Sequence, residues 1–200
     1  MGRIELIVGC MFSGKSSELI RRVRRYESIS TNVLSINNDE DTRYDDNLNN
    51  IVTHDQVKQN AISVNKLLPL MLTQQYKDAS IIAINEGQFF SDLADFCITS
   101  ADYHNKTIII AGLNGDYKRE PFEEISKLMP HADEILKLSA MCKSCNNGTL
   151  ASFTKKTIES TKLIEIGGDD MYEPVCRNCY NKDLKSAQNS KTLMETVKCY

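Results

Sequence analysis

Short, nearly continuous apolar runs alternate along most of the chain with segments of helical periodicity. Such runs are typical of strands covered on both faces, as in a parallel sheet. The predicted strands are residues 4–8, 32–36, 80–84 and 107–111, and the predicted helices are residues 17–26 and 61–72. Strands that alternate with helices predict an α/β fold.

The pattern also predicts how the chain is divided. Residues 37–50 are polar and rich in Asp and Asn, which predicts a loop. After residue 138 the alternation of strands and helices gives way to a cysteine-containing segment. We therefore predict a nucleotide-binding domain at residues 1–138, a small domain at 139–182 and a flexible tail at 183–200.

Composition and charge limit the kinds of partner that we expect this protein to bind. The 200 residues carry a formal net charge of −3, whereas a dedicated nucleic-acid binder usually has a strong basic excess. The apolar runs are far shorter than a membrane-spanning helix. We expect no nucleic-acid partner and no membrane contact. The start of the chain lacks the apolar stretch of a secretory signal, which predicts a cytoplasmic protein.

One basic cluster stands out, formed by Arg21, Arg22, Arg24 and Arg25. The cluster falls in an amphipathic helical pattern, so we interpret it as a solvated helix face. A subunit contact or a contact with phosphate stays open as an alternative for one of these arginines.

Four of the seven cysteines form two closely spaced pairs. Cys142 and Cys145 are one pair, and Cys176 and Cys179 are the other, with 30 residues between them. Each pair can supply two thiolates to one tetrahedral Zn²⁺, and four thiolates leave no open position, so the zinc would be structural. The segment between the pairs would be a loop fixed at both ends, a natural substrate lid. Redox chemistry is the alternative.

A phosphate-binding motif follows the first predicted strand and opens the first predicted helix. Gly9-Cys10-Met11-Phe12-Ser13-Gly14-Lys15-Ser16 matches G-x-x-x-x-G-K-[ST] in full. Glycines let backbone N–H groups curl toward phosphate oxygens, and the helix N-terminus adds positive potential. Lys15 is expected to reach the β- and γ-phosphates, and Ser16 to offer a hydroxyl to Mg²⁺. This P-loop alone does not distinguish a GTPase, a motor or a small-molecule kinase.

The predicted strand at residues 80–84 is followed by a second set of polar residues that could take part in phosphate chemistry. P-loop proteins usually carry an aspartate here that helps to hold the metal, but this chain has Asn85. The next residue, Glu86, is the candidate general base for an attacking hydroxyl. A purely structural glutamate that caps a helix is the alternative.

Taken together, these motifs resemble the type II thymidine kinases, the cellular and poxvirus-like cytosolic enzymes. The resemblance runs in order from about residue 3 to 182. Besides the P-loop and the cysteine pairs, it is carried by Asp41-Thr42-Arg43-Tyr44, Thr53-His54-Asp55, Asn85-Glu86-Gly87-Gln88-Phe89-Phe90, Gly112-Leu113-Asn114-Gly115, Lys118-Arg119-Glu120-Pro121-Phe122, Ala151-Ser152-Phe153-Thr154-Lys155, Ile166-Gly167-Gly168-Asp169-Asp170-Met171-Tyr172 and Cys176-Arg177-Asn178-Cys179-Tyr180.

The resemblance implies a P-loop NTPase fold of the RecA-like kind, with a small four-cysteine zinc domain that carries a lasso loop. It implies transfer of the γ-phosphoryl group of ATP to the 5′-hydroxyl of thymidine, with Mg²⁺ and structural Zn²⁺. It further implies a homotetramer and feedback inhibition by thymidine triphosphate. Glu86 would accept the proton.

The binding residues follow from the same resemblance. Those for ATP would be residues 9–16 with Asp41, Thr42, Arg43, Asn85, Gly87 and Gln88. Those for thymidine would be Met11, Leu113, Tyr117, Thr154, Leu163, Ile164, Glu165, Ile166, Gly167 and Tyr172, with Tyr117 stacked on the base.

Three positions depart from the family pattern. Asn85 and Asn114 stand where the family has aspartates, and Tyr117 stands in place of phenylalanine. An amide carries no charge to offset Mg²⁺. The alternatives are therefore a catalytically impaired nucleotide-binding regulator or a kinase of altered pyrimidine specificity. An ATP-driven nucleic-acid remodeller is disfavoured by the acidic charge.

Overall fold

A parallel six-stranded sheet forms the centre of the molecule. The computed structural model describes residues 1–39, 50–52, 57–157 and 171–182, and the strands of this sheet follow the order β5-β2-β6-β7-β1-β8. Every pairing within it is parallel. The strands are β1 (Arg3–Gly9), β2 (Val33–Asn38), β5 (Ile62–Val64), β6 (Ile81–Ile84), β7 (Thr107–Gly112) and β8 (Glu134–Leu138). The predicted α/β fold with a parallel sheet is confirmed.

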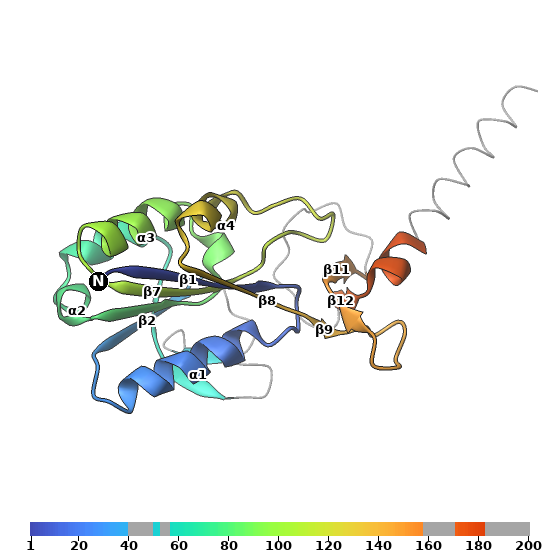
Figure 1. Cartoon of the computed structure of the whole chain (residues 1–200), viewed down its shortest axis with the longest axis horizontal. Coiled ribbons are helices and arrows are strands. Elements are labelled where there is room, and N and C mark those ends of the chain that lie inside the picture. The colour runs from blue at the N-terminus through green and yellow to red at the C-terminus, as the bar shows by residue number, and fades with distance from the viewer. Residues whose placement is uncertain (40–49, 53–56, 158–170, 183–200) are drawn as a thin grey trace, which may run out of the picture.

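Helices cover both faces of the sheet (Figure 1). Helix α1 lies on one face, and α3 and α4 lie on the other. The helices are α1 (Lys15–Glu27), α2 (Gln74–Asp78), α3 (Leu93–Asp102) and α4 (Glu123–Leu128), with 3₁₀ turns η1 (Leu68–Leu72), η2 (Gly87–Phe89) and η3 (Met129–His131). In the part of the chain described, no helix has the length and apolar character needed to cross a membrane.

The period of two along each strand builds a separate core on each face of the sheet. In β7, Ile108 and Ile110 join the cluster beneath α3 and α4, whereas Ile109 joins the cluster beneath α1. All three side chains are 0% exposed. Successive strand residues point to opposite faces, so a run of isoleucines without polar interruption fills both cores.

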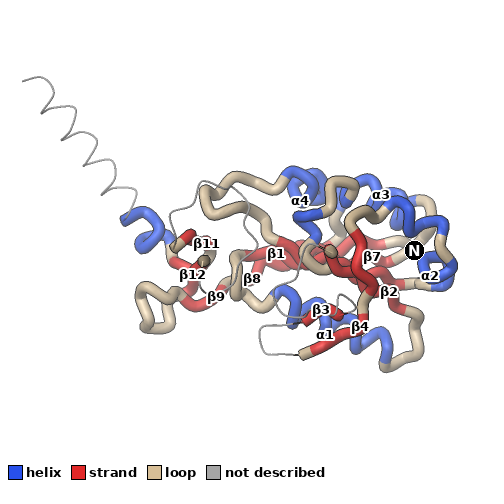
Figure 2. The backbone as a smooth tube through the Cα atoms, turned by 180° about the vertical axis from the view of Figure 1, so that it is seen from behind, coloured by secondary structure: helices blue, strands red, loops and turns tan. Residues whose placement is uncertain are grey.

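The remaining strands form three small ribbons. These are β3 (Asn50–Val52) with β4 (Lys58–Asn60), β9 (Ala140–Met141) with β10 (Leu150–Ala151), and β11 (Phe153–Lys156) with β12 (Tyr172–Val175). Figure 2 shows the first ribbon beside α1. The other two surround the four cysteines and share a third hydrophobic cluster. We call residues 139–157 and 171–182 the metal lobe; the domain boundary at 138/139 stays a prediction.

The predicted helix at residues 61–72 is wrong. Residues Ile62–Val64 form β5, which pairs in parallel with β2, and only Leu68–Leu72 turn as a short 3₁₀ helix. The buried carboxylate of Asp92 accepts the backbone N–H groups of Leu67 and Leu68 at 2.9 and 3.0 Å. These long-range bonds, with the open edge of the sheet beside β2, outweigh local helical preference.

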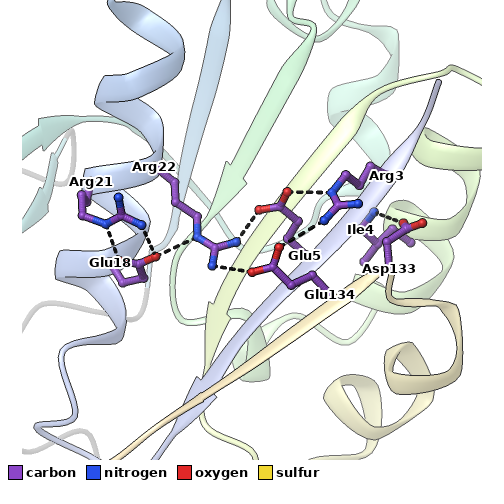
Figure 3. Close-up of polar contacts among 8 residues, drawn as sticks. All are labelled: Arg3, Ile4, Glu5, Glu18, Arg21, Arg22, Asp133 and Glu134. Atoms are coloured by element: carbon purple, nitrogen blue, oxygen red, sulfur yellow. Dashed lines mark hydrogen bonds and ion pairs between the residues drawn. The ribbon is translucent and has the colours of Figure 1, made fainter.

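The solvated-face interpretation holds for three of the four arginines and is wrong for Arg22. Arg21, Arg24 and Arg25 are exposed, but Arg22 is only 9% exposed. Figure 3 shows Arg22 between α1, β1 and β8. Its guanidinium donates to Glu18 at 2.9 Å, to Glu134 at 2.8 Å and to the buried carboxylate of Glu5. Arg22 therefore ties α1 to the sheet as a structural ion pair.

Replacing Arg22 with Met is expected to reduce the free energy of unfolding by about 2 kcal/mol at pH 7, because Glu5 loses its buried partner and keeps only Arg3, whose side chain is 42% exposed. The hydrogen bond from Arg21, followed by that from Arg22, lowers the pKa of Glu18 to about 2, and Arg22 also lowers the pKa of Glu134. Carboxylates with lowered folded-state pKa values contribute stability above about pH 4.3, which is lost as the pH falls toward 2. The difference between variant and wild type should therefore shrink below about pH 4.

Urea denaturation at pH values between about 2.5 and 7 measures this difference in the free energy of unfolding. The matched control is Arg25→Met on the same helix, where the side chain is exposed and the effect should stay within about 0.5 kcal/mol. Equal effects of the two substitutions would contradict the role assigned to Arg22.

Candidate active site

The candidate site residues lie where the parallel strands end. β1 leads into the P-loop, β6 into Asn85 and Glu86, β7 into Leu113, and β8 into the metal lobe. Carboxyl ends of parallel strands share one edge of the sheet, the usual place for ligands in such folds. In Figure 1 this edge faces the metal lobe.

The P-loop folds around its own backbone carbonyl. The ammonium of Lys15 donates to the carbonyl oxygen of Cys10 at 2.9 Å, and the Ser13 hydroxyl donates to the same oxygen at 2.8 Å. Gly14 has φ +82° at the start of α1, a conformation that favours glycine. A side chain at Gly9 would meet the carbonyl oxygen of Leu138 at 2.5 Å. The glycines of the motif are therefore required by the geometry of the loop.

Asn85 lies next to Ser16, as the motif predicts for a metal-associated position. Its amide oxygen accepts the Ser16 hydroxyl at 2.9 Å, and its amide nitrogen donates to the side-chain oxygen of Asn37 at 3.0 Å. Asn85 and Asn37 are 2% and 4% exposed. The bond to Asn37 orients Asn85 so that an oxygen faces Ser16. A hydroxyl and an amide oxygen are ligands that fit Mg²⁺.

Glu86 is half-buried and has a strained backbone. Its φ of +50° lies in the left-handed region, which costs about 1–3 kcal/mol for a residue other than glycine. The carboxylate accepts the side-chain N–H of Gln88 at 2.5 Å, and the Gln88 oxygen accepts the backbone N–H of Leu113 at 2.9 Å. Gln88 thus joins the ends of β6 and β7 and fixes the direction of the Glu86 carboxylate.

The four cysteines of the two pairs come together in the metal lobe. All four Sγ atoms lie within 4.8 Å of one another, and Cys145 Sγ lies 3.7 Å from Cys176 Sγ and 3.4 Å from Cys179 Sγ. Zinc–sulfur bonds of about 2.3 Å in a tetrahedron place sulfurs ~3.8 Å apart, so the set fits one Zn²⁺. None of the four is in a disulfide.

The backbone favours thiolates at Cys142 and Cys176, whereas contacts among the sulfurs raise the pKa of Cys145 and Cys179. The N–H groups of Cys145 and Cys176 donate to Cys142 Sγ at 3.4 and 3.2 Å. Burial raises the pKa of the Cys142 thiol, but these N–H groups outweigh it and leave the pKa below its ordinary value. The backbone N–H of Cys179 lowers the pKa of Cys176 to about 7. Deprotonated sulfurs are the form that binds zinc.

The metal lobe is bonded directly to the P-loop. The Cys10 thiol donates to the carbonyl oxygen of Ala151 at 3.3 Å, and the Met11 backbone N–H donates to the Thr154 hydroxyl at 3.0 Å. Both bonds are buried, and Cys10 belongs to the hydrophobic cluster of the lobe. Met11 and Thr154, two predicted substrate residues, are thus in contact.

Tyr117 and Tyr172, two further predicted substrate residues, lie beside strand β11. Lys156 of β11 pairs with the buried Tyr172 of β12, and its ammonium lies 5.3 Å from the centroid of the Tyr117 ring. Leu113 directly follows β7, and its backbone N–H donates to the side-chain oxygen of Gln88. Outside the described residues are Asp41, Thr42, Arg43, Leu163, Ile164, Glu165, Ile166 and Gly167.

Two residues at this edge were missed by sequence reasoning. Asn37 was assigned to a loop, although β2 continues through Asn38; two polar residues that directly extend an apolar strand were the available signal. Tyr180 was seen only as part of a motif, and its contact with the Tyr117 backbone comes from segments far apart in sequence.

Replacing Cys145 with Ser should lower the zinc content from about one equivalent per chain toward zero and reduce the melting temperature, because the tetrahedral set loses one thiolate. Atomic absorption and thermal melting measure the two effects. Cys97→Ala is the matched control: this cysteine is a fully buried residue of α3, so stability should fall with zinc content unchanged. Full zinc retention in Cys145→Ser would contradict the proposed ligand set.

Comparisons with known proteins agree with this geometry. The family model described as thymidine kinase matches residues 2–180. The thymidine kinase of raccoon poxvirus is 44% identical over 179 residues, which cover 90% of this chain and 97% of the relative. Those of vaccinia virus (strain Western Reserve) and monkeypox virus are each 43% identical with the same coverage. With the match spanning both the P-loop and the four-cysteine cluster, the chain belongs to the thymidine kinase family, in its poxvirus-like type II branch.

Proposed function

We propose that this protein transfers the γ-phosphoryl group of ATP to the 5′-hydroxyl of thymidine, giving thymidine monophosphate and ADP. Membership of the family and the names of its relatives support this activity. The structural observation that carries it is the bonding of the P-loop to the metal lobe, with Glu86 at the carboxyl end of β6 in the same sheet, separated from β1 by β7. This arrangement supports a phosphate site, a general base and a nucleoside-binding lobe at one edge of the sheet.

The nucleotide would be held mainly by the P-loop. Backbone N–H groups of residues 9–16 and the helix N-terminus would face the phosphates, and the Lys15 ammonium would exchange the Cys10 carbonyl for phosphate oxygens. Mg²⁺, when bound, would neutralise charge between the β- and γ-phosphates, with Ser16 and Asn85 as the residues that hold it. Asp41, Thr42, Arg43, Gly87 and Gln88 complete the proposed ATP site.

Glu86 would remove the proton that phosphoryl transfer releases. As the 5′-oxygen forms its bond to the γ-phosphorus, the bond from that phosphorus to the bridging oxygen of ADP breaks, and the hydroxyl proton passes to the carboxylate of Glu86. The hydrogen bond from Gln88 fixes this carboxylate before substrate binds. A fixed base avoids reorganisation during the reaction.

Thymidine would lie between the P-loop and the metal lobe. Met11, Leu113, Tyr117, Thr154 and Tyr172 are proposed as its described contacts, and residues 163–167 as the backbone that hydrogen-bonds the base. A site built from hydrogen-bonding groups of fixed direction rejects bases with unmatched edges more strongly than an apolar pocket does. Zinc would act only through the shape of the lobe, because four thiolates leave no open position.

Neither alternative function is favoured. Asn85 keeps an oxygen directed at Ser16, so the metal position retains a suitable ligand without the carboxylate. We further propose a homotetramer, feedback inhibition by thymidine triphosphate and a cytoplasmic location, where reduced thiols persist. These three rest on the family resemblance.

Replacing Glu86 with Gln should lower kcat by at least about a hundredfold, because the amide cannot accept a proton. Binding of ATP should change little, since the amide oxygen can still accept the hydrogen bond from Gln88. Turnover of labelled thymidine and calorimetric titration with ATP give the two values. Glu123→Gln, with the side chain 81% exposed on α4, is the control and should leave both unchanged. Loss of ATP binding in Glu86→Gln would show that Glu86 serves the nucleotide instead.

Replacing Asn85 with Asp should reduce the half-saturating Mg²⁺ concentration at least about fivefold, since a unit charge near a divalent ion contributes at least ~1 kcal/mol even with the screening of water. The metal-free variant should melt at a lower temperature than wild type, because the carboxylate is buried without a cation. Initial rates and thermal melts across a Mg²⁺ series measure both. An unchanged Mg²⁺ requirement would mean that this side chain does not face the metal.

A further inference from the structure

The segment that carries Tyr117 is a compact turn with its own internal bonds. The Asp116 carboxylate accepts the backbone N–H groups of Lys118 and Glu120, each at 2.8 Å. The Asp116 N–H donates to the Glu120 carbonyl at 2.9 Å, and Gly115 forms a β-bridge with Pro121. The turn is therefore internally braced, and contacts from outside it set where Tyr117 lies.

The metal lobe supplies such a contact. The hydroxyl of Tyr180 donates to the backbone carbonyl oxygen of Tyr117 at 2.7 Å. The guanidinium of Arg119, on the same turn, lies 4.4 Å from the centroid of the Tyr180 ring and 5.6 Å from that of Phe153. Figure 1 shows the segment between β7 and α4 extending toward β11 and β12. The Lys156 ammonium of the lobe also lies 5.3 Å from the centroid of the Tyr117 ring, so one hydrogen bond and three cation–π contacts join the turn to the lobe.

The position of Tyr180 depends in turn on the cysteine cluster. Tyr180 directly follows Cys179, and its backbone N–H donates to the carbonyl oxygen of Cys176 at 2.9 Å. This bond is the first helical bond of residues 177–182, and the Tyr180 ring projects from that helical turn. The ring also packs against Phe153 of β11, with centroids 5.6 Å apart. When the four-cysteine cluster is ordered, the Tyr180 hydroxyl lies where it can donate a hydrogen bond to the Tyr117 carbonyl oxygen.

We propose that Tyr180 is a positioning residue that holds Tyr117 at the thymidine base, so that thymidine affinity depends on the four-cysteine cluster through this contact. The inference rests on the proposed function, because it takes Tyr117 as the residue stacked on the base. Tyr180 touches neither substrate in this scheme and acts only through the backbone of the Tyr117 turn. Its effect should fall on thymidine and not on ATP.

The first test is Tyr180→Phe, which removes the hydroxyl and keeps the ring. Calorimetric titration should show thymidine affinity weakened about fivefold, the size expected for one net hydrogen bond. KM for thymidine should rise by a similar factor, while kcat, KM for ATP and zinc content stay at wild-type values. Tyr103→Phe is the matched control, because Tyr103 is 80% exposed at the end of α3.

A double-mutant cycle tests whether Tyr180 acts through Tyr117. In a Tyr117→Ala background, Tyr180→Phe should no longer change thymidine affinity, since the ring that it positions is gone. Additive effects of the two substitutions would overturn the proposal. Loss of zinc or of ATP affinity in Tyr180→Phe would also overturn it, because the residue would then support the lobe as a whole.

Failure of this inference differs from failure of the proposed function. If the wild-type protein binds and phosphorylates thymidine and Tyr180→Phe binds it equally well, only the positioning role is wrong. If the wild-type protein binds no thymidine, the proposed function is wrong and the positioning role falls with it.

Discussion

Two buried hydrogen bonds, donated by the P-loop and accepted by the metal lobe, hold the candidate site together. The Met11 N–H bonded to Thr154 and the Cys10 thiol bonded to Ala151 fix the phosphate-binding backbone against strands that the cysteine cluster organises. Each such bond contributes only about 1 kcal/mol net, but leaving either partner unpaired when buried costs more. The lobe and the loop therefore have to be placed together, which brings the proposed triphosphate and nucleoside sites to one edge of the sheet.

A second constraint concerns charge at that edge. Asn85 and Asn37 form a neutral, buried pair in which each polar contact is matched, and Ser16 is bonded to the outward oxygen. A neutral pair carries no buried charge to compensate before metal binds. The charged side chains that we propose for catalysis are those of Lys15 and Glu86. The strained backbone of Glu86 and its bond to Gln88 keep its carboxylate in one direction. Strain of this kind clusters at functional sites.

Sequence reasoning succeeded where local pattern and tertiary environment agree. The isoleucine-rich runs became central strands because alternate residues are buried on the two faces of the sheet. The P-loop glycine at the start of α1 has the left-handed conformation that the motif requires. It failed where distant groups decide the outcome. Residues 61–72 follow a helical pattern, but the sheet edge and Asp92 impose a strand and a short turn. Arg22 resembles its exposed neighbours in sequence, but carboxylates from two strands surround it.

The amino-acid sequence by itself determined the parallel α/β fold, the P-loop, the four-cysteine set and the family, because each depends on residue type and short spacing. Only the tertiary structure decided three hydrogen bonds. Asn85 donates to Asn37, and Gln88 donates to the Glu86 carboxylate. The Tyr180 hydroxyl donates to the Tyr117 carbonyl oxygen. The first and third bonds join groups that are far apart in the sequence, and the second depends on the left-handed backbone angle of Glu86. A pattern of residue types does not encode such distances or directions, since they follow from the packing of the whole chain.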